Sequence, residues 1–470
     1  MLQIVQPYDG ALIKTIPMQS LADVELCLDK AYKVFNEREK WLPAYQRITI
    51  LERVITIMSD KRDSLANLAA SEGGKPLLDS NVEVDRAING VKLAVESIAQ
   101  LAGDEIPMGH TVSSANRLAF TRREPIGVVV AVSAFNHPLN LIIHQVIPAI
   151  AVGAPVIIKP AKATPLSCLA FIDILREAGL PDEWCKAVIC SHEVTEKLVT
   201  DKRVNFFSFI GSGDIGWALR AKLSAGTRCA LEHGGVAPVI IGKSRSANLD
   251  MANAQTNELV SSLVKGAFYH AGQVCVSVQR IYVPLDDSEA LAMILANAAK
   301  KLVVGDPLDP ATEVGPLISP SEVDRVETWV EEAHEAGAMV LCGGHRLSDT
   351  CYAPTVLLNP PEELAVSTKE IFGPVVCVYS YSDKSDAIRR ANRLPFAFQA
   401  AIYSNDLDDV IATSAKLNAS TVMVNDHTAF RVDWMPFGGR DESGLGMGGI
   451  SYSMKDMTRE KMVVIKSPSL

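Results

Sequence analysis

A long alternation of short apolar runs and helical patterns, beginning near residue 126, is the feature that most constrains the fold. The runs that resemble strands cover 127–132, 155–158, 187–189 and 205–210, and the helical stretches between them cover 139–152, 165–178, 194–199 and 213–224. Short apolar strands joined by helices predict a parallel sheet with helices on both faces. Ligands bind such sheets at the carboxyl ends of the strands. Asn136, Lys159 and Gly211 each follow such an end.

A second alternation begins after Gly235. Its strand-like runs cover 238–241, 280–283, 338–341, 375–380, 399–403 and 421–424, and its helical stretches cover 249–268, 287–302, 321–336 and 384–392. The chain has 470 residues, which is too long for one hydrophobic core. We therefore expect an α/β protein with two Rossmann-like parallel domains.

The two ends of the chain have other patterns. Residues 1–16 read as two short strands around a turn, Ser20 as the cap of a helix, and the region up to about residue 101 as three more helices. We interpret the charged residues of these helices as solvated faces. Residues 106–122 read as an extended arm, and residues 461–466 as a strand that we expect to pair with the arm of another subunit.

These patterns predict three parts. The first α/β part would comprise 1–105 and 123–232 with part of 426–447, the second α/β part 233–425, and the arm 106–122 and 448–470.

Composition excludes several classes of protein. A net charge of −10 argues against a nucleic-acid partner. The nine cysteines include no C-x-x-C pair, so we expect free thiols in the cytoplasm and neither a disulfide framework nor a metal site. The N-terminus lacks the pattern of a secretory signal. The apolar region 139–158 is interrupted by polar residues, glycine and proline, so we expect no membrane span.

A glycine motif of the form G-x-G-x-x-G occupies residues 211–216, where a strand ends and a helix begins. This arrangement predicts a pyrophosphate site at the helix N-terminus. Glu232 follows sixteen residues after the last glycine, but a ribose role for it is doubtful because this strand is not the first of the chain.

Several other residues each have two readings. Lys159 and Lys162 form either a solvated turn or a site for ribose oxygens or a 2′-phosphate. Asn136 is either a turn residue or an oxyanion donor. Glu232 is either a hinge carboxylate bonded to backbone or a general base. Cys275 is either a buried structural cysteine or a nucleophile. Glu370 and Phe372 form either a plain turn or a clamp on a cofactor.

Taken together, these motifs resemble those of the aldehyde dehydrogenase superfamily over nearly the whole chain. The matching segments are Phe135–Pro138, Lys159–Pro160, Phe209–Ser212, Leu231–Gly235, Gly272–Cys275, Glu370–Pro374 and Pro436–Gly439. The resemblance implies that the first of the three parts is a cofactor-binding domain, the second a catalytic domain, and the arm a bridging element that builds homodimers or homotetramers. It also implies oxidation of an aldehyde with NAD or NADP and no metal.

The resemblance implies catalytic roles that fit the chemistry. Cys275 would attack the aldehyde carbon as a thiolate. The Asn136 side chain and the Cys275 backbone N–H would hold the thiohemiacetal oxyanion. After hydride transfer leaves a thioester, Glu232 would activate the water that releases the acid.

The resemblance also implies contacts with the cofactor. Lys159 would hold the adenosine ribose, Ser212 the pyrophosphate and Glu370 the nicotinamide ribose, with Phe372 nearby. The other expected cofactor contacts are Ser133, Phe135, Gly211 and Gly235. Lys162 stands where NAD-preferring members often carry Glu, so we expect either a preference for NADP or use of both cofactors.

The expected substrate tunnel carries His137, Leu141, His144, Arg431 and Phe437. These residues favour a small polar or anionic aldehyde. Candidates are lactaldehyde, glyceraldehyde 3-phosphate, phosphonoacetaldehyde, sulfolactaldehyde and succinate semialdehyde. In the alternative reading, Arg431 pairs with Asp433 or another carboxylate and never meets the substrate.

Three rival functions compete with this one. A CoA-acylating dehydrogenase would usually lack the base at Glu232. A cysteine hydrolase would leave the cofactor motifs without a purpose. A non-catalytic protein of the same fold would not need Cys275, Glu232 and Asn136 together.

Overall fold

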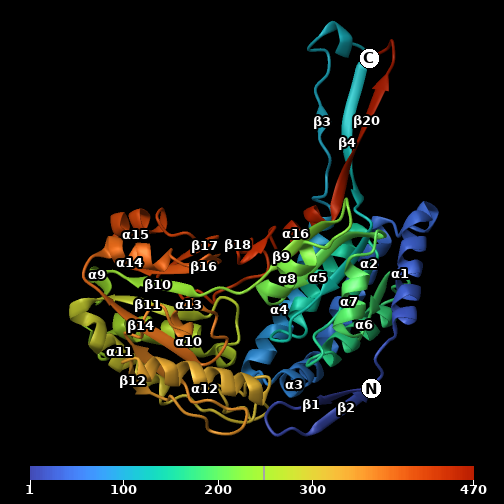
Figure 1. The fold of residues 1–470 in the computed structure, drawn as a ribbon. Helices are drawn as coiled ribbons and strands as arrows, with labels where there is room; N and C mark the ends of the chain where they lie inside the picture. The colour runs from blue at the N-terminus through green and yellow to red at the C-terminus, as the bar shows by residue number, and fades with distance from the viewer. Residues whose placement is uncertain (247–248) are drawn as a thin grey trace.

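The computed structural model describes residues 1–246 and 249–470, and its first sheet has six strands in the order β19-β9-β8-β5-β6-β7 (Figure 1). The strands are β5 (Val128–Val132), β6 (Val156–Lys159), β7 (Cys185–Ala187), β8 (Val204–Ile210), β9 (Arg228–Glu232) and the antiparallel β19 (Gly444–Leu445). All others pair in parallel. The chain order therefore reverses between β5 and β8, which is where ligands bind in doubly wound sheets.

Helices cover both faces of this sheet. They are α1 (Leu21–Asn36), α2 (Ala44–Asp60), α3 (Arg62–Gly73), α4 (Leu77–Ile98), α5 (Asn140–Val152), α6 (Leu166–Glu177), α7 (His192–Val199) and α8 (Gly213–Arg220). Val128 and Val130 pack with α1 and α7 on one face. Val129 and Ala131 pack with α2, α4, α5 and α6 on the other. Alternate residues of one strand thus serve two cores, which explains its unbroken apolar sequence.

The second sheet has seven strands in the order β12-β13-β14-β11-β10-β16-β17. The strands are β10 (Ala237–Ile241), β11 (Val278–Pro284), β12 (Met339–Cys342), β13 (Thr355–Leu358), β14 (Val375–Tyr381), β16 (Gln399–Tyr403) and β17 (Thr421–Val424). Its helices are α9 (Lys243–Ser246), α10 (Ala254–Phe268), α11 (Leu285–Ala299), α12 (Pro320–Glu335), α13 (Ala365–Thr368), α14 (Lys384–Ala391) and α15 (Leu407–Ser414). Only β12 runs antiparallel. The predicted fold class of two parallel α/β sheets is confirmed.

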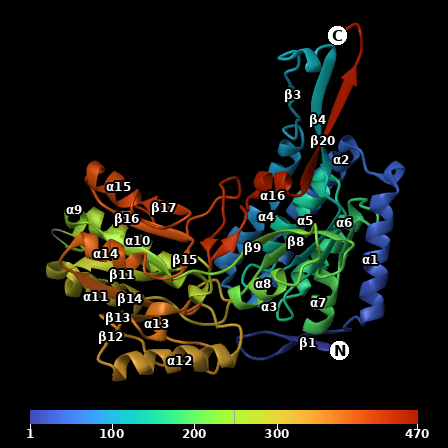
Figure 2. The ribbon, with the colours of Figure 1, turned by 45° about the horizontal axis from the view of Figure 1, so that its top comes forward.

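A long antiparallel ribbon projects from the body of the molecule (Figures 1 and 2). Its strands β4 (Arg117–Pro125) and β20 (Thr458–Lys466) pair antiparallel along their whole length, and β3 (Glu105–Ile106) adds a short edge. The expected pairing of the tail with the arm of another subunit was wrong, because the tail pairs with its own arm. The cause is α16 (Ile450–Asp456), which packs on α5 and brings Thr458 beside Pro125.

Several predicted boundaries shift. β7 lies two residues before the predicted 187–189, and α10 begins at Ala254, five residues later than predicted, because Asn253 caps it. Three strands of these two sheets, β9, β13 and β19, were not predicted. β9 carries Arg, Cys and Glu on a partly exposed run that has no clean alternation.

The solvated-face interpretation was wrong for three residues of the N-terminal helical region. Glu72, Lys75 and Glu83 are fully buried. The Glu72 carboxylate accepts hydrogen bonds from two N–H groups at the start of α6, at 2.6 and 2.7 Å. Glu83 accepts two at the start of α5, both at 2.9 Å, and pairs with the Lys75 ammonium. These carboxylates therefore fix the loops that follow β5 and β6.

The described residues contain neither a candidate membrane-spanning helix nor a candidate metal site. None of their helices is both long enough and apolar enough to span a bilayer. They also contain no group of three or more His, Cys, Asp or Glu side chains placed to bind a metal ion.

Candidate active site

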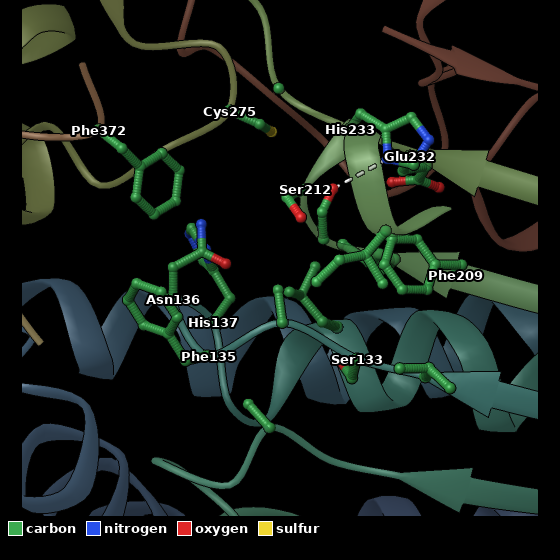
Figure 3. A pocket seen from close by; sticks show the side chains of 18 of the residues that line it. Ser133, Phe135, Asn136, His137, Phe209, Ser212, Glu232, His233, Cys275 and Phe372 are labelled. Carbon is green, nitrogen blue, oxygen red and sulfur yellow. Dashed lines mark hydrogen bonds between the residues drawn. The ribbon is translucent and has the colours of Figure 1, made fainter. Parts of the chain in front are cut away.

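A cavity of about 960 Å³ opens at the carboxyl ends of β5, β6 and β8 and extends to the loop before β11 (Figure 3). All predicted site residues except Gly235 and His144 line it. They are Ser133, Phe135, Asn136, His137, Leu141, Lys159, Lys162, Gly211, Ser212, Glu232, Cys275, Glu370, Phe372, Arg431 and Phe437. Residues from both sheets thus meet at one place.

Cys275 lies directly after a strained turn. His270 and Ala271 have φ values of 49° and 53°, in the left-handed region that residues other than glycine rarely occupy. Gly272 has φ 69°, and a Cβ there would lie 2.1 Å from the carbonyl oxygen of Gly373. Only glycine fits at this position. Strain of this kind persists where the surrounding structure fixes it, often at functional sites.

The Cys275 thiol is partly enclosed by the cavity. Desolvation raises its pKa to about 12, with the Glu370 carboxylate adding to the rise and the Arg431 guanidinium opposing it. The free protein therefore holds Cys275 as a thiol at neutral pH. Attack on a carbonyl requires loss of that proton when the ligands bind.

Asn136 lies across the opening from Cys275 (Figure 3). Its amide nitrogen donates a hydrogen bond to the carbonyl oxygen of Gln273 at 2.8 Å, which ties the loop after β5 to the turn that carries the cysteine. An amide nitrogen has two hydrogens, so the second stays available for an oxygen in the cavity.

Glu232 ends β9 on a third side of the opening (Figure 3). A Cβ on Gly448 would lie 2.3 Å from one of its carboxylate oxygens, so the absence of a side chain there makes room for it. Desolvation raises the pKa of Glu232, and Arg431 opposes this. Within the described residues, no hydrogen bond reaches the carboxylate, which does not match the reading as a hinge bonded to backbone.

The region beyond the nucleophile carries polar atoms without protein partners. The Ser133 hydroxyl and one Glu370 carboxylate oxygen are buried and have no hydrogen-bond partner among the described residues. The Ser212 side chain does not cap α8, which leaves the N–H groups of that helix start free of a side-chain acceptor. No carboxylate of the described chain lies within 4 Å of the buried Lys159 ammonium. These groups fit a ligand with hydroxyl and phosphate oxygens, as a dinucleotide has.

His233 supports the turn between β8 and α8. Its Nδ1–H donates to the carbonyl oxygen of Gly211 at 2.9 Å. Its ring packs against Phe209 and Trp217. The ring thus holds the phosphate-side turn in place.

The Glu370 carboxylate lies over Gly234, where a Cβ would come within 2.0 Å of it. Desolvation raises the pKa of Glu370 to about 8, and a hydrogen bond from the Gly235 N–H opposes the rise. Gly235 itself does not line the cavity. Phe372, with φ 48°, packs edge-on against Phe135 at 5.7 Å between ring centroids.

The substrate side is formed around Arg431. Its guanidinium carbon lies 3.6 Å from the centre of the Phe437 ring. Among the described residues, no carboxylate lies within 4 Å of this guanidinium. Asp433 instead pairs with Arg86 at 2.8 Å and with His144 at 2.9 Å. The alternative reading, in which Arg431 pairs with Asp433, does not hold.

His144, predicted to line the substrate tunnel, does not line this cavity. Its ring lies behind the cavity wall, where it contacts Asp433 on one side and Arg431 on the other. His137 lines the cavity beside Tyr269, whose hydroxyl is 3.4 Å from its Nε2.

Sequence reasoning missed several residues of the cavity wall. They include Arg86, Asn140, His192, Thr195, Tyr269 and Arg325. Tyr269 lies three residues before Gly272 and could have been found with that motif. Arg86 lies on α4, far from every motif, and no spacing in the sequence marks it.

The sequence profile of the Aldehyde dehydrogenase family matches residues 1–463. This chain belongs to the aldehyde dehydrogenase family. It is 36% identical to 3-sulfolactaldehyde dehydrogenase of Priestia aryabhattai over 423 residues, covering 90% of this chain and 86% of that protein. The predicted family is confirmed.

Solved structures agree with this assignment. Glyceraldehyde-3-phosphate dehydrogenase GapN of Methanocaldococcus jannaschii, complexed with NADP, superposes with a TM-score of 0.92 at 35% identity and covers 99% of both chains. Aldehyde dehydrogenase 21 of Physcomitrella patens, in complex with the reaction product succinate, superposes with a TM-score of 0.93 at 32% identity, covering 99% of this chain and 95% of that one. The protein is accordingly an NAD(P)-dependent aldehyde dehydrogenase.

Proposed function

We propose that this aldehyde dehydrogenase oxidises a small anionic aldehyde to its carboxylic acid and prefers NADP. The observation that carries the substrate class is Arg431, a guanidinium on the cavity wall that has no carboxylate partner within 4 Å in the described chain. A buried cation without a partner is costly, and a substrate anion would offset that cost.

The chemistry begins at Cys275. Its sulfur, after losing its proton, forms a bond to the aldehyde carbon, and the carbonyl electrons move onto oxygen. The Asn136 amide and the Cys275 backbone N–H stabilise that oxyanion. When bound, NAD(P)+ supplies a hydride acceptor. Loss of the hydride from the substrate carbon leaves a thioester on Cys275.

Glu232 completes the turnover. Its raised pKa and its place on the cavity wall suit a general base. It takes a proton from water, the water oxygen bonds to the thioester carbon, and the carbon–sulfur bond breaks. The carboxylic acid and the Cys275 thiol result. A general base at this position argues for water, not CoA, as the acyl acceptor, so CoA should not change the rate.

Relatives support the anionic class. The similar proteins include a dehydrogenase named for 3-sulfolactaldehyde, which is anionic, and a structure that contains the dianion succinate. Arg86 lines the same cavity but is paired with Asp433 at 2.8 Å, whereas no carboxylate of the described residues lies within 4 Å of Arg431.

The NADP preference rests on Lys162 and Lys159, which both line the cavity beyond the phosphate-side turn. One carboxylate on that wall, Glu196, lies 2.8 Å from the Lys222 ammonium and is compensated by it. Two ammonium groups favour a 2′-phosphate over a hydroxyl.

The proposal also covers the domain bounds, the assembly and the cellular location of the protein. We assign the cofactor-binding domain to 1–105 and 123–232 with part of 426–447, the catalytic domain to 233–425 and the arm to 106–122 and 448–470. The projecting ribbon has an open edge along β20, which suits assembly into a homodimer or homotetramer. With nine free cysteines, the cytoplasm is the expected location.

The test is cofactor reduction by purified protein with succinate semialdehyde and with butanal, which have the same chain length and differ in the carboxylate. We expect higher kcat/KM for the anionic aldehyde and for NADP over NAD. Arg431→Leu should lower kcat/KM for succinate semialdehyde at least ten-fold more than for butanal. An equal loss for both aldehydes would mean that Arg431 serves Glu232 and not the substrate. A large advantage for NAD would refute the role of Lys162.

A further inference from the structure

The contacts that the described residues make with the Arg431 guanidinium come from two neutral side chains, His144 and Phe437. Its guanidinium lies over the Phe437 ring at 3.6 Å, and its Nη2 lies 3.4 Å from Nδ1 of His144. Its Nε is buried and has no hydrogen-bond partner among the described residues. Asp433, the nearest carboxylate along the chain, points elsewhere. The arrangement holds the guanidinium in place with no carboxylate of the described residues within 4 Å of it.

The tautomer of His144 follows from its two neighbours. A guanidinium can only donate hydrogen bonds, so the Nδ1 of His144 must accept and carries no proton. The Nε2 then carries the proton and donates it to Asp433 Oδ1 at 2.9 Å. Burial lowers the pKa of His144 to about 4, with the Arg431 charge adding to the shift, so the ring is neutral at pH 7. Hydrogen bonding of one ring nitrogen thus sets the function of the other.

Asp433 is itself fixed from several sides. It accepts hydrogen bonds from Arg86 Nη2 at 2.8 Å, from Arg86 Nε at 3.3 Å and from Asn140 Nδ2 at 3.4 Å. Burial alone would raise the pKa of Asp433, but the hydrogen bond from His144 and the charge of Arg86 hold it well below its usual range. The carboxylate therefore stays an anion that orders His144.

We infer that His144 is a positioning residue that fixes Arg431 as the anion-binding group of the substrate site, with Asp433 setting the His144 tautomer. This inference rests on the proposed function. Without the Nδ1 acceptor, Arg431 keeps only its contact with the Phe437 ring and can turn towards Asp433 or Glu232. Either contact would neutralise the guanidinium, and the enzyme would lose its selectivity for anionic aldehydes.

A purely structural role of His144 predicts something different. If His144 only fills the core, its replacement changes turnover of charged and uncharged aldehydes by the same factor. The informative quantity is therefore the selectivity ratio, which is kcat/KM for succinate semialdehyde divided by kcat/KM for butanal, with NADP as acceptor.

Two substitutions separate the two ring nitrogens. The Asn side chain places an oxygen near the position of Nδ1, and the Gln side chain places an amide near the position of Nε2. His144→Asn can keep the acceptor for Arg431, whereas His144→Gln keeps the donor to Asp433 and loses that acceptor. We expect His144→Gln to lower the selectivity ratio about ten-fold, mainly through KM of the anionic aldehyde. We expect His144→Asn to lower it less than three-fold.

The outcomes are distinguishable. A wild-type ratio near one refutes the proposed substrate class and this inference with it. A high wild-type ratio that His144→Gln leaves unchanged overturns only this inference. If His144→Gln fails to fold, as judged by thermal unfolding, His144→Asn decides alone, and loss of the ratio in that variant overturns the inference.

Discussion

Replacing Glu83 by Gln should destabilise the fold and disturb the active site together. The Glu83 carboxylate pairs with the Lys75 ammonium, and both side chains have no exposed surface. The same carboxylate accepts two N–H groups at the start of α5, directly after the loop that carries Asn136. Gln keeps one acceptor oxygen but removes the charge. Lys75 is then buried without its partner.

The cost can be bounded in two ways. Removing one partner of a buried ion pair costs about 3–5 kcal/mol. Alternatively, Lys75 can lose its proton on folding. From its ordinary pKa of 10.5, that costs about 5 kcal/mol at pH 7, because one pKa unit is worth about 1.4 kcal/mol. Both routes give a loss of about 3–5 kcal/mol for Glu83→Gln at pH 7.

The second route has a pH signature. In Glu83→Gln the unfolded chain would bind one more proton than the folded chain, so the free energy of unfolding rises with pH. The slope is about 1.4 kcal/mol per pH unit between pH 7 and 9, and the deficit relative to wild type shrinks accordingly. Lys75→Met combined with Glu83→Gln removes the titrating group and should show no such slope.

Urea unfolding at pH 7, 8 and 9, followed by tryptophan fluorescence, measures these differences. The turnover number of each variant, measured in parallel, reports on the Asn136 loop, and we expect it to fall in Glu83→Gln. A loss below about 1 kcal/mol at pH 7, or equal pH slopes in the single and double variants, would refute the reasoning.

Three further predictions concern the reacting groups. Alkylation of Cys275 by iodoacetamide in the free enzyme, followed by mass spectrometry, should rise about ten-fold per pH unit from pH 6 to 9, because its pKa is about 12; a plateau near pH 8 would contradict this. Glu232→Gln should keep the burst of NADPH in stopped-flow but lose about 10²–10⁴-fold in steady-state rate; a missing burst would place its role earlier. Gly234→Ala should raise KM for NADP, because the new Cβ would meet the Glu370 carboxylate 2.0 Å away; an unchanged KM would remove Glu370 from the cofactor site.

The cofactor side of the cavity could be predicted from sequence because it depends on a local rule. Lys159 ends one strand of a parallel sheet and Gly211 follows another, and the carboxyl ends of such strands meet at one edge. Apolar runs mark those strands, so the positions of the polar residues after them follow directly.

The interior charges could not be predicted in the same way. On α4, Glu83 and Arg86 show the spacing of an ordinary solvated face. They are buried or line the cavity only because α4 packs across the start of α5. His144 was predicted to line the substrate tunnel but lies behind the cavity wall. The sequence does not reveal that Asp433 and Arg431 lie on either side of its ring.

The hydrogen bond between Asn136 and Gln273 joins the two halves of the molecule at the active site. The nucleophile comes from the half of the molecule built on β10 and β11, and the amide that faces it comes from the half built on β5. Neither half holds both groups, so a fragment containing only one should be inert even if it folds. Activity would return only when complementary fragments dock, which makes turnover itself a reporter of correct assembly.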